Sequence, residues 1–139
     1  MKKVLKDLKK LKDVYYDTEE IEVGKELKVK MRMLTSEEET ETHAYSMKYE
    51  EGLAYLYSVK RETLCRCIIG LNGEEIPEFI EDTDEKGLPE KIQKHVWLRK
   101  NVVKGWNQML VDSVWSGYAK LVERVEEKMN LDIKTEENE

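Results

Sequence analysis

Residues 21–33 read IEVGKELKVKMRM, in which apolar and charged residues alternate on both sides of a glycine. Alternation with a period of two indicates strands that bury one face. The loop length decides whether both strands turn their apolar residues to the same side. A three-residue loop at 24–26 pairs Val23 with Leu27 and unites the apolar sets, whereas a two-residue turn separates them. The sequence therefore predicts a β-hairpin over residues 19–34 with a three-residue loop.

The chain changes to helical spacing after this hairpin. Thr35 or Ser36 can accept hydrogen bonds from the first free helix amides, and Ser36 with Glu39 has the spacing of a capping box. Apolar residues then recur every three or four positions as far as Ile68. Gly52 interrupts this run, and glycine weakens a helix interior by about 1 kcal/mol relative to alanine. We therefore expect a kink or a break there.

Turn signals divide the remainder of the chain. The pair Asn72-Gly73, between apolar residues, predicts a small hairpin. Residues 82–87 are expected to form an acidic loop, and residues 88–90 to open another helix, because proline is tolerated in a first helical turn. After a bend at Gly105, a broad apolar stripe over residues 106–129 predicts the last helix.

These patterns predict one α+β domain, mostly α, over residues 1–139: an N-terminal β-hairpin followed by three or four helices. Residues 1–15 are expected to form a basic amphipathic helix. The hairpin occupies 19–34, the helical core 36–130, and an acidic flexible tail 131–139. For the first helix the alternative is a lysine-rich flap that packs weakly on the domain, because isolated helices of about 12–15 residues are marginal in water.

Composition and charge narrow the classes of function. Hydrophobic residues make up 40% and charged residues 39% of the chain, and the net charge is −6. No apolar run is long enough for a membrane span or a secretory signal, so we expect a cytoplasmic protein without membrane contact. The acidic balance disfavours nucleic-acid binding, which relies on clustered lysine and arginine, although six lysines lie within the first twelve residues.

The residues that carry chemistry in other proteins show no convincing spacing here. Cys65 and Cys67, with His43 and His95, are the only set that suggests a metal. Two positions apart on a helix, the thiols point about 200° apart, so they cannot easily share one ion or pair with each other. We expect free cysteines that are buried or half-buried. Without a nucleophile elbow or a phosphate-binding glycine pattern, we expect no enzyme activity, no metal and no cofactor.

Aromatic and methionine side chains supply the candidate binding surface. Trp97 and Trp115 lie off the main stripe, which contains Trp106 and Tyr118. Such side chains outside the core face are favoured at protein interfaces. The alternative is a small helical domain that buries several faces. The predicted partner-binding residues are Trp97, Trp106, Trp115, Tyr118 and Met109.

The order of several short motifs along the chain resembles the layout of one protein family. They are the basic alternating strand at 28–33, the helix start at 34–39, the segment KRETLCRCII at 60–69 before a glycine-containing turn, Gly105-Trp106, and VDSVWSGY at 111–118. Over about residues 20–130 this layout resembles the small tail assembly chaperones and baseplate hub assembly proteins of tailed bacteriophages. The basic N-terminal helix has no counterpart in that layout.

The resemblance implies a non-enzymatic protein-binding factor in the cytoplasm of a bacterial host. Such a factor would hold a tape-measure protein or a baseplate hub subunit in an apolar groove until assembly. Proteins of this kind are small, often oligomeric, and need no cofactor. The resemblance is therefore consistent with a homo-oligomer. Two alternatives stay open. One is a structural tail or baseplate subunit of the virion; the other is a cytosolic adaptor unrelated to phage, whose lysine-rich helix contacts an acidic partner or nucleic acid.

Overall fold

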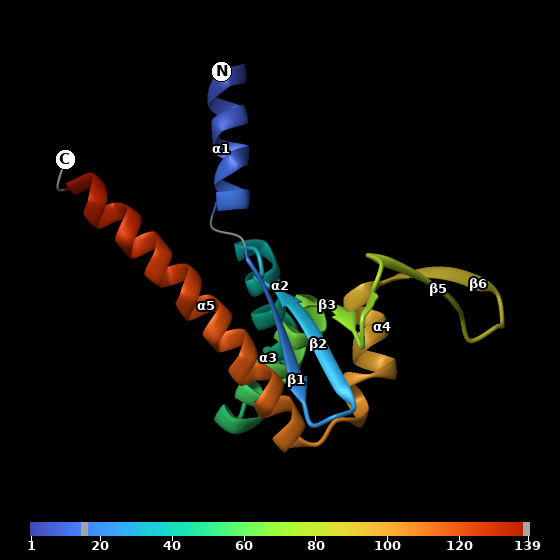
Figure 1. Cartoon of the computed structure of the whole chain (residues 1–139). Helices are drawn as coiled ribbons and strands as arrows, with labels where there is room; N and C mark the ends of the chain where they lie inside the picture. The colour runs from blue at the N-terminus through green and yellow to red at the C-terminus, as the bar shows by residue number, and fades with distance from the viewer. Residues whose placement is uncertain (15–16, 138–139) are drawn as a thin grey trace.

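The computed structural model describes residues 1–14 and 17–137, with the side chains of residues 1–8 and 17–134. The elements run in the order α1 (Lys2–Val14), β1 (Thr18–Val23), β2 (Leu27–Arg32), α2 (Ser36–Ser46), α3 (Gly52–Cys67), β3 (Ile68–Leu71), β4 (Glu74–Glu75), β5 (Phe79–Thr83), β6 (Pro89–Gln93), α4 (Lys94–Asn101), the 3₁₀ helix η1 (Val103–Gly105) and α5 (Gln108–Glu137) (Figure 1). Within the described residues helix predominates, and a hairpin precedes four α-helices. The predicted class, α+β and mostly α, is confirmed.

The β1–β2 hairpin has the predicted register. Val23 pairs with Leu27 and Ile21 with Val29, so the connecting loop has three residues. Gly24 in this loop adopts a φ of +64°, a left-handed conformation that glycine enters without steric penalty. The apolar side chains of both strands consequently share one face, on which Val29 is fully buried.

A second hairpin extends this sheet. β3 and β4 pair across the predicted turn at Asn72-Gly73, and β3 also pairs with β2, which gives the antiparallel order β1-β2-β3-β4. The Asn72 side-chain oxygen accepts a hydrogen bond from the Lys28 amide at 2.8 Å, and the Asn72 amide donates to the Lys28 carbonyl at 2.9 Å. One asparagine therefore both shapes the turn and joins it to β2.

Helix α5 crosses the apolar face of the sheet, and Gly117 allows it to lie close (Figure 1). A Cβ added at Gly117 would lie 2.9 Å from two side-chain carbons of Ile21 and 3.1 Å from the terminal carbon of Met31. Favourable carbon–carbon contacts are about 3.5–4.0 Å. The missing side chain therefore sets the distance between α5 and the sheet, even though glycine costs about 1 kcal/mol in a helix interior.

The first turn of α2 is held by the end of β2. Thr35 is the N-cap: its hydroxyl accepts from the Glu38 amide at 3.2 Å, and the Glu38 carboxylate accepts from the Thr35 amide at 3.0 Å. Arg32 binds the same carboxylate through two nitrogens, both at 2.7 Å. The predicted capping box of Ser36 and Glu39 is therefore wrong by one residue, because Arg32 selects Glu38.

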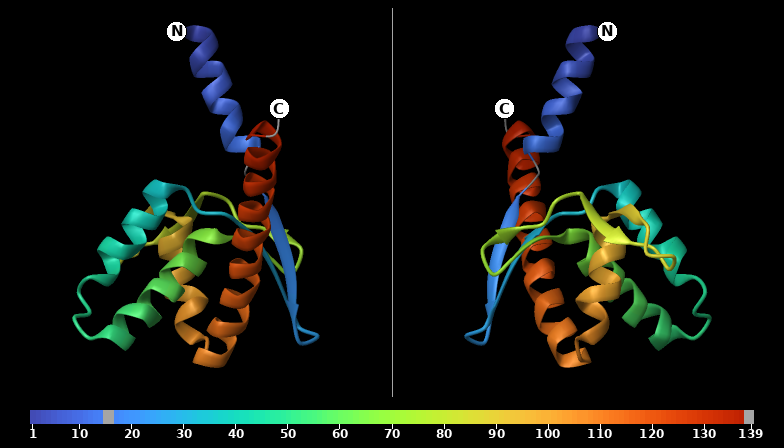
Figure 2. Two further views of the ribbon diagram at one scale, coloured as in Figure 1. Left: turned by 90° about the vertical axis from the view of Figure 1, so that its left-hand side faces the viewer. Right: turned by 90° about the vertical axis from the view of Figure 1, so that its right-hand side faces the viewer.

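Helix α3 lies at the centre of the helical half of the molecule. The break expected at Gly52 is present, since α2 ends at Ser46 and α3 begins at Gly52. From there α3 runs between α2, α4 and α5 directly into β3 (Figure 2). All six residues from Glu62 to Cys67 are buried as a result, although two of them are charged.

A hairpin replaces one predicted helix. Residues 88–90 do not open a helix; Pro89 begins β6, which pairs with β5 in a two-stranded antiparallel sheet that projects from the body (Figure 1). The predicted helical core over residues 36–130 is therefore interrupted by β3, β4, β5 and β6, and α4 begins only at Lys94.

The carboxylate of Asp84 explains this difference. It accepts hydrogen bonds from the amides of Lys86 and Leu88, both at 2.9 Å, and thereby closes the turn between β5 and β6. Proline is tolerated at the start of a strand as well as in a first helical turn. Pro89 is compatible with both structures, so the Asp84 turn decides between them.

The first and the last of the described elements are helices. Residues 2–14 form α1, and Tyr15, which belongs to the predicted first helix, lies outside the described residues. Residues 131–137 continue α5 instead of forming a flexible tail, because extending a helix from a packed segment costs little once it is nucleated. Residues 138–139 lie outside the described part. None of the described helices is both long and apolar enough to cross a membrane.

The Glu38 carboxylate makes folding sensitive to acid. Burial, the largest influence, raises the pKa of Glu38, but the hydrogen bonds from Arg32 and from the Thr35 amide outweigh it and lower the pKa from 4.5 to about 2. A carboxyl whose pKa is lower in the folded state stabilises the fold above its unfolded pKa. That stabilisation is lost as the pH falls from about 4.5 towards 2.

We expect Glu38→Gln to lower the free energy of unfolding by about 1.5–3 kcal/mol at pH 7, the range for hydrogen bonds to charged groups. Near pH 2 the difference should be much smaller, because the carboxyl is then almost fully protonated in the unfolded state and about half protonated in the folded state. Urea unfolding at the two pH values measures both differences. Glu37→Gln, in the same exposed turn, is the control and should have little effect. An undiminished difference at low pH would contradict the charge-based explanation.

Candidate functional site

The five residues predicted to bind a partner do not form one surface. Tyr118 is only 5% exposed, and its hydroxyl accepts a hydrogen bond from the Leu34 amide at 3.3 Å. Its place on the stripe of α5 that faces the sheet makes it a core residue, so we remove it from the candidate surface. Trp115 is half-buried against the core, with its ring centroid 5.8 Å from that of Tyr118.

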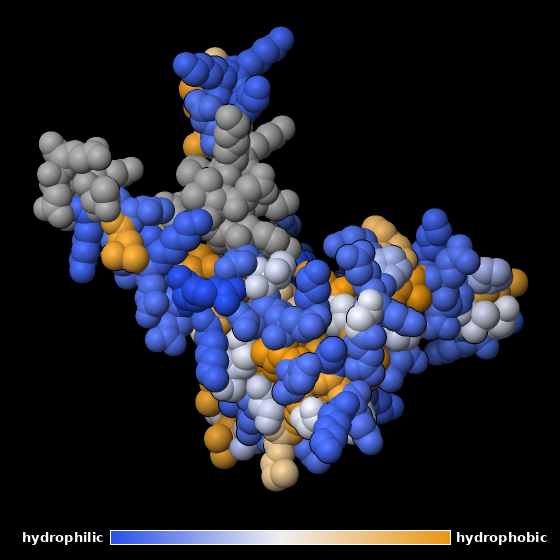
Figure 3. Space-filling model, in the orientation of Figure 1, coloured by the Kyte–Doolittle hydropathy of each residue, from blue (hydrophilic) through white to orange (hydrophobic). Residues whose placement is uncertain are grey.

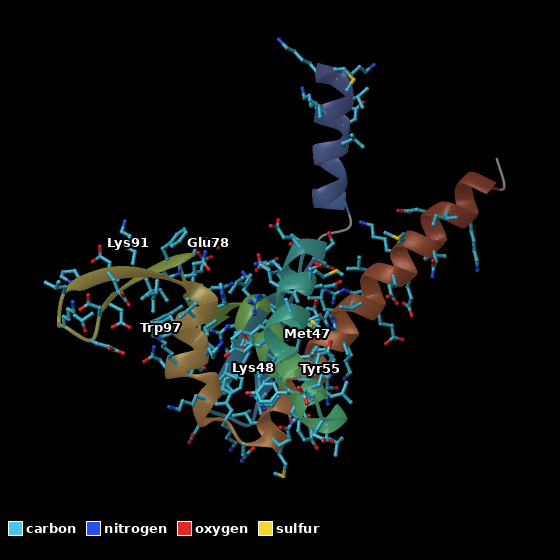
Figure 4. All side chains as sticks on the ribbon, turned by 180° about the vertical axis from the view of Figure 1, so that it is seen from behind. Met47, Lys48, Tyr55, Glu78, Lys91 and Trp97 are labelled. Carbon is cyan, nitrogen blue, oxygen red and sulfur yellow. The ribbon has the colours of Figure 1, made fainter. Side chains whose placement is uncertain are left out.

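The other three predicted residues are also separated. Trp97 is half-buried against the core on α4, towards the β5–β6 side of the molecule (Figure 4). Met109 is 78% exposed on the first turn of α5. Trp106, which follows η1, lines a cavity. Among the five predicted residues, the structure brings the rings of Trp115 and Tyr118 into contact, whereas Met109 is not among the residues that line the cavity of Trp106.

The cavity that contains Trp106 lies between α2, α3, α4 and η1. Its volume is about 530 Å³, within the usual range for ligand pockets. The side chains with the most binding capacity are three aromatic rings and four cations: Tyr45, Tyr49 and Trp106, with Arg61, Arg99, Lys100 and Lys104. Among these only Trp106 is a predicted site residue.

A buried ionic cluster adjoins the cavity, which it lines through Glu62 and Arg99. Glu62 and Arg66 on α3 are 2% and 5% exposed, and the Arg66 Nη1 donates to Glu62 Oε1 at 3.1 Å. Arg99 on α4 completes the cluster: its Nε donates to Glu62 Oε2 at 2.8 Å, and its Nη2 also binds Oε1. Breaking a buried pair of this kind costs about 3–5 kcal/mol because it leaves an unpaired charge.

The wall of the cavity joins aromatic rings to cations. The Arg99 guanidinium lies over the Tyr45 ring at 4.1 Å from its centroid. The Lys48 ammonium approaches the same ring at 4.0 Å and that of Tyr49 at 5.4 Å (Figure 4). Cation–π contacts of this kind contribute about 0.5–2 kcal/mol, depending on exposure. They orient Tyr45 and Arg99 along one side of the cavity.

The missed residues carried weak signals in the sequence. Tyr45 and Tyr49 are four residues apart, a spacing that indicates an apolar helix face as well as a cavity wall. Arg99 lies about fifty residues further along the chain, and nothing in its local pattern relates it to either tyrosine. The packing of α2 and α4 against α3 brings these three side chains together.

The thiol of Cys65, which lines the cavity, is not a nucleophile. Burial, followed by the nearby Glu62 carboxylate, raises the pKa of Cys65 to about 12, so the sulfur stays protonated near neutral pH. Burial also raises the pKa of Cys67. Both cysteines are free and buried, as predicted. In the part of the chain that is described, no three or more His, Cys, Asp or Glu side chains are grouped so as to hold a metal ion.

The comparisons with known proteins do not extend this description. No protein-family model matches the sequence, and no curated protein or solved structure matches it.

Both thiols should be unreactive in the native protein. We expect a thiol reagent such as Ellman's reagent to modify Cys65 and Cys67 at neutral pH only after denaturant is added, because burial excludes the reagent and keeps the sulfurs protonated. The denatured chain, which has two cysteines, is the control. Rapid modification of one thiol in the folded protein would contradict the assignment.

Glu62→Gln should destabilise the protein strongly. It preserves the shape of the side chain but leaves Arg66 and Arg99 without their shared counter-ion, so we expect a loss of about 3–5 kcal/mol in the free energy of unfolding. Urea unfolding measures this loss. Glu81→Gln, at an exposed position on β5, is the matched control and should have little effect. Equal stability of the two variants would show that the cluster does not depend on the Glu62 charge.

Proposed function

We propose that this chain is a non-enzymatic protein-binding factor that binds an acidic segment of its partner in the cavity between α2, α3, α4 and η1. One observation carries the proposal: three aromatic rings and four cations surround a single cavity in a chain with a net charge of −6. Aromatic and arginine side chains are favoured at the centres of protein interfaces.

The charge of the cavity favours an acidic partner. Glu62 holds Arg99, but among the described residues no ion pair joins Arg61, Lys100 or Lys104 to a carboxylate. Lys100 and Lys104 are exposed at the rim. A cationic patch on an otherwise acidic molecule attracts acidic segments and orients them as they approach.

The surroundings of the cavity favour a protein segment over a compact small molecule. Tyr57 and Leu53 precede Arg61 by four and eight residues, so all three lie on one face of α3. These two apolar side chains are 38% and 66% exposed. An amphipathic segment can place apolar residues on this row and a carboxylate in the cavity.

The family resemblance suggests the class of partner. We propose a tail or baseplate component of a bacteriophage, such as a tape-measure protein or a baseplate hub subunit, held until it is incorporated. If the chain is instead a structural subunit, it will be present in finished particles. The exposed side chains of Lys2, Lys3 and Lys6 on α1 favour a further candidate, a cytosolic adaptor that binds an acidic partner through that helix.

A peptide-display selection on the purified chain tests the proposed site. We expect enrichment of peptides that combine acidic with aromatic or aliphatic residues. For a selected peptide, Lys100→Glu/Lys104→Glu should raise the dissociation constant about tenfold or more, measured by fluorescence anisotropy. Lys86→Glu/Lys91→Glu changes the net charge equally on the β5–β6 hairpin, where Figure 4 shows Lys91, and should bind normally.

The two variants separate local binding from general charge attraction. Equal weakening in both would contradict the cavity as the binding site. Selection of peptides without acidic residues would contradict the proposed partner chemistry. For the assembly role, the selected motif should occur in a tape-measure or baseplate-hub polypeptide, and the cavity variant should fail to capture that polypeptide.

A further inference from the structure

Helix α1 leaves three apolar residues near its start uncovered. It stands away from the body in each view (Figures 1 and 2), and Val4, Leu5 and Leu8 are 51%, 52% and 55% exposed. An isolated helix of about 12–15 residues is marginal in water, so a 13-residue helix needs a covered face to persist. Its exposed apolar residues therefore indicate a site of association.

The far end of α5 has the same property. Val125 is the last core residue of α5, and beyond it lies the segment 126–137, called distal α5 here. Met129 and Ile133 continue the buried stripe of Val125 at helical spacing, but they are 40% and 46% exposed. Figure 3 shows apolar atoms on the surface of both α1 and distal α5. The stripe that packs on the sheet thus runs on past the body.

The two uncovered helices have opposite charges. Helix α1 contains six lysines and two aspartates, a net charge of +4. Distal α5 contains five acidic and two basic residues, a net charge of −3. A contact between two helices has an apolar seam and charged residues on both sides of it. Two amphipathic helices of opposite charge are complementary in both of these parts.

An ion-pair cluster brings both helices to the same end of the body. Arg124 binds Asp17 at 2.8 Å and also Glu19, and it donates to the Thr18 carbonyl at 2.9 Å. The start of β1 is therefore tied to α5 one residue before Val125. The lengths also match, since each helical segment is about 20 Å long at 1.5 Å per residue.

We propose that two copies of this chain form a dimer in which α1 of each copy packs against distal α5 of the other. Each copy offers both complementary surfaces, so a two-fold arrangement repeats the same contact twice. Leu131, 64% exposed, projects about 160° away from Met129 and Ile133 around the helix. One helix covers only one of these sides, whereas a bundle of four helices from two copies covers both.

Charge reversal tests this proposal on the full-length chain. Lys2→Glu/Lys3→Glu/Lys6→Glu makes α1 acidic like distal α5, and Glu126→Lys/Glu127→Lys makes both helices basic. We expect the original chain to dimerise, and each variant alone to dissociate with a dissociation constant raised about tenfold or more. Mixing the two variants should restore a dimer, because each acidic helix then meets a basic one. Sedimentation velocity measures all four samples.

The mixing experiment distinguishes a second copy from closure of α1 on distal α5 within one chain. Internal closure predicts monomers in every sample, including the mixture, and that result would overturn the proposal. A dimer that persists unchanged in both variants would place the contact on another face and would overturn it as well. Near-UV circular dichroism checks that the exposed substitutions leave the body folded. Peptide binding to the cavity should be unaffected, so the two proposals fail independently.

Discussion

The buried carboxylate of Glu62 is the group on which the helical half of the molecule depends. Arg66, on the same helix, and Arg99, on α4, balance its charge. Because an unpaired buried charge costs several kcal/mol, α4 must stay where Arg99 reaches α3. The same guanidinium stacks on Tyr45, which ties α2 to this contact. One buried charge thus holds three helices around the cavity.

The parts of the fold that could be predicted are those that local physics determines. One buried face leaves a single acceptable register for the first hairpin, and an Asn-Gly pair favours the positive φ values of a tight turn. Two other features depend instead on particular side chains. The sequence allows the N-cap of α2 at Thr35 or at Ser36, and it allows a strand or a helix to begin near Pro89. Arg32 makes the first selection and Asp84 the second. The Arg32–Glu38 pair has no fixed spacing that the sequence displays, and the Asx-turn spacing of Asp84 and Lys86 predicts a turn without showing that a strand follows it.

The candidate site was less predictable than the fold for a related reason. Helical spacing shows that Trp106 and Tyr118 belong to one apolar pattern, but it does not show which part of that pattern a neighbouring element covers. The sheet covers Tyr118, whereas Trp106 lies before the helix begins and faces the cavity. The cavity itself combines residues of α2, α3 and α4, which the packing of α2 and α4 against α3 brings together.

The two proposed binding surfaces differ in their charge and in their place on the molecule. The cavity is cationic although the chain is acidic, and Lys48 beside it lies well away from α1 in Figure 4. A dimer joined through α1 and distal α5 would therefore leave both cavities open. Two equivalent cavities in one dimer would bind a partner with repeated acidic segments more tightly than a single cavity does. Once the first segment is bound, the second contact forms at a high effective concentration. Self-association through the terminal helices would in this way strengthen the binding proposed for the body.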